Sequence, residues 1–108
     1  TQSEEWLLAK VRTTQDQTWQ LLHTAGQTIA RAHEAVGRAG GDPRADAAQL
    51  ERARELIRKA QWFWDSVAAE NSMGAHNPGG NLNTLGQSID LAHQAIEAAY
   101  RAAGAPAK

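Results

Sequence analysis

Mostly apolar residues recur at alternating steps of three and four in three long segments, and this spacing constrains the fold more than any other feature. The first segment has Leu8, Val11, Gln15, Thr18, Leu22, Ala25, Ile29, Ala32 and Val36. The second has Leu50, Ala53, Ile57, Ala60, Trp64 and Val67, and the third has Leu82, Leu85, Ile89, Ala92, Ile96, Ala99 and Ala103. Such steps place side chains on one face of an α-helix. The sequence therefore predicts an all-α fold of three long amphipathic helices.

Two turn clusters set the expected bounds of these helices, which we place at about residues 3–37, 43–71 and 80–103 of a single helical region. Asp42 is predicted to cap the second helix, because its carboxylate can accept hydrogen bonds from first-turn amides and Pro43 needs no N–H there. Asn77-Pro78 offers the same start signal for the third helix, but Gly79-Gly80 is expected to delay the helix by a few residues, since glycine weakens helix propagation. Gly104, followed by Pro106, is expected to end it.

The heptad-like spacing favours helices that cross at shallow angles, and the many alanines on the predicted faces allow close approach. An antiparallel bundle or a helical array follows. The first helix is much longer than the third, so part of its apolar face would lack an intrachain partner. We expect an interface with another chain or domain there; the alternative is that the extra length frays.

Composition excludes several classes of function. The formal net charge is -1, with 11 basic and 12 acidic residues interspersed, so the sequence has no basic stripe for nucleic acid or anionic lipid. No segment approaches the ~20 consecutive apolar residues of a membrane span. Thr1 opens on polar sequence, so we expect either that the protein is not secreted or that its signal lies upstream. The absence of cysteine removes thiol nucleophiles, zinc-thiolate sites and covalent haem attachment.

No arrangement of residues marks a catalytic site. The serines lack a Gly-x-Ser-x-Gly context and a paired base, so we expect no enzyme activity from the chain alone. His23, His33 and His93 lie within predicted helices without a second ligand at a recognised spacing, and we interpret them as surface or packing residues.

His76 is the strongest candidate for a ligand, because it lies in the irregular segment 71–80 that separates the second and third helices. One imidazole cannot hold a structural metal, which takes about four protein ligands. It can complete the coordination of a metal held elsewhere. The alternative is a loop histidine that caps a helix or bonds to backbone.

Trp62 and Trp64 are two residues apart and so point to different sides of a helix. We assign Trp64 to the core stripe, and Trp62 with Phe63 to its flanks. The flanking pair could pad a flat cofactor or another helix, but hydrophobic packing, with an indole N–H that needs an acceptor, is the simpler interpretation.

The block from Lys59 to Pro78, with the core Ala-Glu-Asn-Ser-x-Gly-x-His-Asn-Pro at residues 69–78, resembles a motif of ammonia-forming, pentahaem cytochrome c nitrite reductases near their C-terminus. It is also similar to the wider family of octahaem tetrathionate and nitrite reductases. Flanking segments add to the resemblance, which covers nearly the whole chain: Glu4-Glu5-Trp6 to Val11-Arg12, Gln15-Asp16, Leu85-Gly86 and Ile89-Asp90.

The resemblance implies a function for the parent protein. Members of this family are periplasmic multihaem enzymes that reduce nitrite to ammonia, take electrons from a quinol-oxidising or other donor cytochrome, and form homodimers largely through long C-terminal helices. By the match, His76 would be the distal axial ligand of a bis-histidine haem c that is attached upstream, and haem iron would be its only metal.

The chain also departs from the family. It lacks Cys-x-x-Cys-His, the lysine variant of that motif and the catalytic arginine, tyrosine and histidine, so the resemblance implies an end piece of a multihaem cytochrome without catalytic residues. Ala75 and Gly79-Gly80 replace residues that are usually larger. Two alternatives stay open, an independent helical interaction module without haem and the end region of an octahaem reductase.

Overall fold

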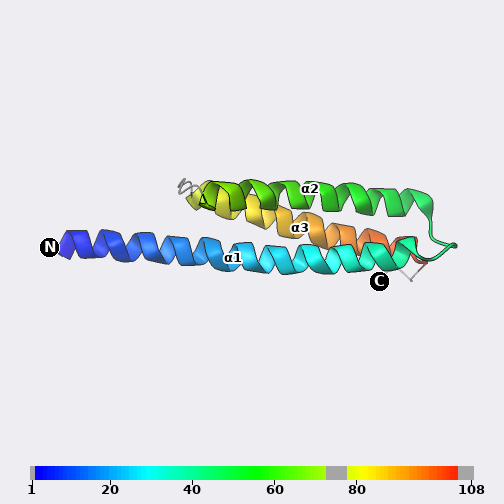
Figure 1. Cartoon of the computed structure of the whole chain (residues 1–108), viewed down its shortest axis with the longest axis horizontal. Helices are drawn as coiled ribbons and strands as arrows, with labels where there is room; N and C mark the ends of the chain where they lie inside the picture. The colour runs from blue at the N-terminus through cyan, green and yellow to red at the C-terminus, as the bar shows by residue number, and fades with distance from the viewer. Residues whose placement is uncertain (1, 73–77, 105–108) are drawn as a thin grey trace.

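The computed structural model describes residues 2–72 and 78–104, apart from the side chains of residues 14, 72 and 78. Within these residues it has no strand and three α-helices, which are α1 (Gln2–Gly40), α2 (Ala47–Ser72) and α3 (Pro78–Ala102). Successive helices run in opposite directions side by side, and α1 protrudes from one end of the bundle (Figure 1). The bundle measures 66 × 26 × 16 Å. The predicted all-α fold is confirmed.

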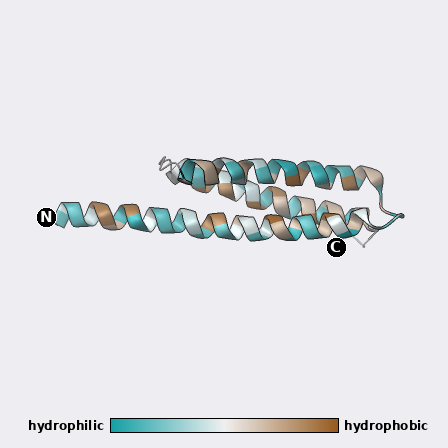
Figure 2. Cartoon of the chain, in the orientation of Figure 1, coloured by the Kyte–Doolittle hydropathy of each residue, from teal (hydrophilic) through white to brown (hydrophobic). Residues whose placement is uncertain are grey.

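The hydrophobic spacing of the sequence explains which sides of the helices face inward. Figure 2 shows hydrophobic residues recurring among hydrophilic ones along the three helices. Most residues of the predicted stripes are buried or half-buried from Thr18 onward in α1 and along α2. In α3 the buried side is wider than predicted, because it also holds Asn81, Ser88, Ala95, Ala98 and Ala102, whereas the predicted Ala103 is exposed. Because each stripe occupies one side of its helix, three helices can enclose a single core while their charged sides stay in water.

The core is built largely from alanine. Two adjoining clusters hold most of it, and their buried members are Ile29, Ala32, Ala35, Ala39, Ala53, Ile57, Ala60, Ala92, Ala95, Ala98, Ala99 and Ala102. Such small side chains let helix axes approach closely, and they leave little room for added atoms. α3 contacts both other helices more extensively than α1 and α2 contact each other. The bundle is therefore organised around α3.

A buried hydroxyl joins two of the helices at mid-length. Ser88 on α3 is fully buried and donates a hydrogen bond to the carbonyl oxygen of Ala60 on α2, with 2.7 Å between the oxygens. A buried hydroxyl without a partner would cost about 1–3 kcal/mol, so this bond makes serine acceptable in the core and favours one register between α2 and α3.

The start of α2 differs from the prediction. The helix begins at Ala47, and its cap is Asp46, whose carboxylate accepts a hydrogen bond from the amide of Ala48 at 3.1 Å. Asp42 accepts from the amide of Arg44 at 2.9 Å and so belongs to a turn that precedes the helix. The amide of Asp46 donates to the carbonyl of Ala102 at 2.8 Å. This contact with the far end of the chain fixes where α2 begins.

The bounds of α3 also differ slightly from the prediction. The helix begins at Pro78, two residues earlier than expected, so Gly79-Gly80 does not delay it. Proline suits the first position of a helix because its fixed φ is already helical. At the other end, Gly104 takes a positive φ of 76° and its amide bonds to the carbonyl of Arg101 at 3.1 Å. The predicted glycine stop is confirmed, with the helix ending at Ala102.

Candidate functional site

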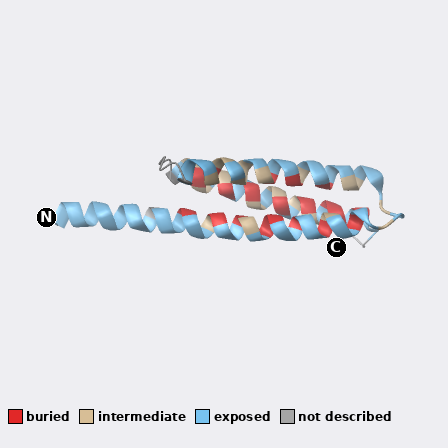
Figure 3. Cartoon of the chain, viewed as in Figure 1, coloured by how far each residue is buried: buried red, intermediate tan, exposed pale blue. Residues whose placement is uncertain are grey.

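The first part of α1 extends beyond the other two helices. We call residues 2–17 the overhang, because every side chain described there is exposed and the first buried residue of α1 is Thr18 (Figure 3). Four large apolar side chains lie on the overhang and are at least half exposed: Trp6, Leu7, Leu8 and Val11. The structure is helical from Gln2 onward. An exposed apolar surface of this kind is typical of a contact site.

Two of these side chains continue the line of the core. Successive residues of a helix are rotated by about 100°, so steps of seven or four return to nearly the same side. Leu7 and Val11 therefore project in the direction of Thr18 and Leu22, which are buried. Trp6 lies about 100–160° away from these four residues, and the ammonium of Lys10 lies 5.0 Å from the centroid of its ring. Leu8, which the spacing placed on the predicted stripe, lies about 80° away from Thr18, at the edge of this line. The overhang thus has a core-facing stripe, Leu7 and Val11, and a separate flank with Trp6.

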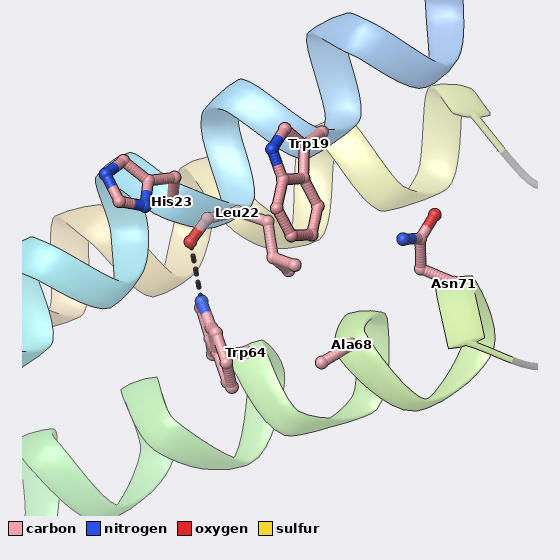
Figure 4. A pocket seen from close by; sticks show the side chains of 6 residues that line it. All are labelled: Trp19, Leu22, His23, Trp64, Ala68 and Asn71. Atoms are coloured by element: carbon pink, nitrogen blue, oxygen red, sulfur yellow. Dashed lines mark hydrogen bonds between the residues drawn. The ribbon is translucent and has the colours of Figure 1, made fainter.

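A cleft lies where the overhang meets the bundle (Figure 4). It has a volume of about 470 Å³ and separates α1 from α2. Its surface is mainly apolar, and its lining residues are Trp19, Leu22, His23, Trp64, Ala68 and Asn71. Beneath it lies a third core cluster, in which Leu22, Ala25, Val67 and Leu85 are buried. The cleft is therefore an opening at the end of the core.

The indole of Trp64 forms one wall of the cleft and ties α2 to α1. Its Nε1 donates to the carbonyl oxygen of Leu22 at 2.7 Å, as the dashed line in Figure 4 marks. The indole packs over Gly26, where a Cβ would lie 3.4 Å from the indole nitrogen, in ordinary van der Waals contact. The prediction that Trp64 belongs to the core stripe is confirmed, and its N–H has the acceptor that a packed indole needs.

The spacing of the sequence did not predict a role for Trp19. Its side chain is 63% exposed, although it lines the cleft opposite Ala68 and Asn71 (Figure 4). A large indole left mostly in water beside a cleft indicates a surface on which another group packs. The signal was its place one turn before the core residue Leu22, on the flank of the predicted stripe.

Trp62 lies on the outside of α2, as predicted. Its side chain is 64% exposed and meets Phe63 edge to face, with 5.4 Å between the ring centroids. Trp62 therefore does not line the cleft, and it forms a second exposed aromatic site.

The histidines do not gather in one place. His23, His33 and His93 are all exposed, as predicted for surface residues, and only His23 lines the cleft. His76, the predicted haem ligand, lies outside the described residues. Among the residues that the structure describes, no three His, Asp or Glu side chains come together as a metal site would require. Nor is any described helix long and apolar enough to cross a membrane.

The chemistry of this end of the molecule is that of a contact surface. It offers exposed indoles, aliphatic side chains and one imidazole, without a paired acid and base or a nucleophile beside a base among the residues described. The cleft and the overhang provide exposed apolar area next to the ends of α2 and α3. Comparison with known proteins identifies the kind of protein in which such an end occurs.

The family described as cytochrome c552 matches residues 1–107, which is nearly the whole chain. The chain belongs to the cytochrome c552 family. Among curated relatives, the cytochrome c nitrite reductase subunit NrfA of Nitratidesulfovibrio vulgaris is 43% identical over 102 residues, which cover 91% of this chain and 20% of the relative. Cytochrome c-552 of Aliarcobacter butzleri is 34% identical over 86% of this chain and 18% of its own length.

A solved cytochrome c552 structure has the same fold. The catalytic subunit NrfA of the cytochrome c nitrite reductase from Desulfovibrio desulfuricans, which is described as having two calcium sites, matches with a TM-score of 0.84 and 39% identity. The match covers 93% of this chain and 22% of that one. The chain thus spans about one fifth of the length of the relatives it matches. The predicted resemblance to this family is confirmed.

Proposed function

We propose that this chain is the C-terminal helical region of a dissimilatory nitrite reductase that converts nitrite to ammonia. In this proposal it supplies one distal haem ligand and contacts for a homodimer, and it carries no catalytic residue of its own. The observation that carries the proposal is the likeness to NrfA in both sequence and structure, 43% and 39% identity with a TM-score of 0.84. This likeness favours the penta-haem nitrite reductase over an octahaem parent.

The haem c groups of the parent would be attached upstream, because this chain has no cysteine for a thioether bond. His76 would reach one of these haems as the distal ligand of its iron. Support comes from its place in the Gly-x-His-Asn-Pro motif, between the end of α2 and the start of α3. That end of the bundle is also where α1 protrudes and the cleft opens, so exposed apolar surface lies nearby (Figure 1). Exposed apolar surface is typical of a site where another domain packs.

The homodimer would form through the long helices. The exposed Trp6 flank of α1 supports this part of the proposal, because Trp6 is 61% exposed and lies away from the core-facing stripe. Tryptophan is enriched at protein interfaces. The remaining partners follow from the parent: the rest of the cytochrome chain, and a quinol-oxidising or other donor cytochrome in the periplasm.

Substitution of the proposed ligand in the parent cytochrome tests this function. His76→Ala should change the absorption and electron paramagnetic resonance signals of one low-spin haem and slow electron delivery, because an axial ligand sets the spin state and potential of its iron. His33→Ala is the matched control, since His33 is exposed on α1. Unchanged spectra of every haem in His76→Ala would remove the ligand role. A parent without Cys-x-x-Cys-His motifs would instead indicate an independent helical module.

A further inference from the structure

The core-facing stripe of the overhang and the cleft form one continuous apolar surface, which none of the residues that the structure describes covers. Resting on the proposed function, we infer that this surface is the seat of the upstream region of the same polypeptide, which packs an apolar segment against Leu7 and Val11 and places side chains in the cleft. The seat is distinct from the Trp6 flank, which is left for the second subunit.

The positions of Leu7 and Val11 around α1 indicate where the upstream segment would lie. Leu7 and Val11 project along the line that α2 and α3 cover farther along the helix, at Thr18 and Leu22. A segment that covers them must lie beyond the ends of α2 and α3 and extend the bundle in its own direction. The exposed fractions of 55% for Leu7 and 50% for Val11 show how much surface it can cover.

The cleft allows side chains of the upstream segment to insert next to the core. Its volume of about 470 Å³ adjoins the buried cluster of Leu22, Val67 and Leu85, so a side chain inserted there would extend the core. Trp19 and Trp64 provide flat apolar walls on opposite helices. His23 and Asn71 line the same cleft and are exposed, so they can bond to polar groups of the entering segment. Apolar walls with a few polar groups are typical of a specific contact.

Chain length favours the upstream region over a second copy of the chain. The matched relatives are about five times as long as this chain, so most of such a parent lies outside the 108 residues. Upstream residues of a parent would join α1 at the tip of the overhang, next to the stripe. Covalent attachment at that point gives a high effective concentration, and consecutive elements of a chain usually pack as neighbours.

The test compares two pairs of substitutions, each in the parent cytochrome and in the 108-residue chain. Leu7→Asp with Val11→Asp puts charges on the seat. Ala9→Asp with Gln27→Asp puts equal charges on exposed positions of α1 that lie about half a turn away from the seat and about 60° away from Trp6. In the parent cytochrome we expect the first pair to lower the Tm by about 5 °C or more relative to the second pair. In the 108-residue chain, where both pairs face water, the two should differ by less than about 2 °C.

The outcomes are distinguishable. Equal Tm values for the two pairs in the parent would overturn the inference. Dissociation of the parent into monomers that keep the original Tm would also overturn it, because the seat would then belong to a second copy. If the first pair prevents the parent from folding while the second pair does not, Leu7→Ala with Val11→Ala should give a smaller decrease in Tm. A parent whose absorption spectrum has no haem bands would refute the proposed function, whichever variant is measured.

Discussion

The two ends of the bundle are packed in opposite ways. At one end, which we call the closed end, alanines alone form the buried cluster: Ala35, Ala39, Ala53, Ala98, Ala99 and Ala102. At the other, the open end, the buried cluster has larger side chains in Leu22, Val67 and Leu85 and still leaves the cleft beside it. The closed end completes its core with its own residues, whereas the open end exposes the indoles of Trp19 and Trp62 and the overhang.

The difference shows where the chain depends on other parts of a protein. Closely packed alanines bring the helix axes together, and the hydrogen bond from Asp46 to Ala102 joins the start of α2 to the end of α3. Helix stability there comes from packing within the chain. Along the overhang, helical residues have no such packing, and isolated helix of this length is marginal in water. The open end is therefore the part that a parent protein would stabilise most.

The largest effect should come from added volume at the closed end. Ala53→Leu inserts three carbons at a fully buried position, and we expect it to lower the free energy of unfolding by about 2–3 kcal/mol, because the packed alanines cannot move apart without cost. Thermal or urea unfolding followed by circular dichroism measures it. Ala48→Leu, at an exposed position of α2, is the control and should change stability by less than about 0.5 kcal/mol. Equal effects would show that the closed end is loosely packed.

A smaller effect is expected at the open end. Trp64→Phe removes the hydrogen bond to Leu22 and part of a half-buried ring, and should cost about 1–2 kcal/mol in the free energy of unfolding. Trp62→Phe is the matched control, because Trp62 is 64% exposed and should cost less than about 0.5 kcal/mol. Were the two variants to unfold alike, Trp64 would not join α1 to α2 in solution.

Much of the fold follows from spacing alone. Steps of three and four predict the three helices, the inward faces and the assignment of Trp64 to the core, because local propensity and burial agree at those positions. The start of α2 does not follow, since both Asp42 and Asp46 satisfy the local cap pattern. The contact that decides between them involves Ala102, which is distant in sequence.

The candidate site is less predictable than the fold. The unpartnered length of α1 follows from comparing helix lengths, but the cleft depends on how Trp19 and Trp64 face each other across two helices. The contact between Gly26 and the indole of Trp64 is equally hidden, because it joins two helices. Spacing within one helix contains no information on such distances between helices. His76 stays a prediction from the motif and the family.

The smallest effect should appear in the turn at the closed end. The hydrogen bond from the Arg44 amide, with a lesser contribution from the Arg44 charge, lowers the pKa of Asp42 below its ordinary value of 3.8. A lowered pKa stabilises the fold at pH values above 3.8, and this contribution is lost as the pH falls through the folded-state pKa. Asp42→Asn should therefore lower the Tm slightly at pH 6 and not at all near pH 2. An unchanged difference across that range would exclude the titration of Asp42 as its cause.

Hydrogen exchange followed by mass spectrometry tests the central claim most directly, namely that the open end is completed by the rest of a multihaem cytochrome. Amides of the overhang, residues 2–17, should exchange quickly in the 108-residue chain and at least about 100-fold more slowly in the parent, whereas those of the closed end should be protected in both. Overhang amides that exchange equally fast in the two proteins would contradict the account.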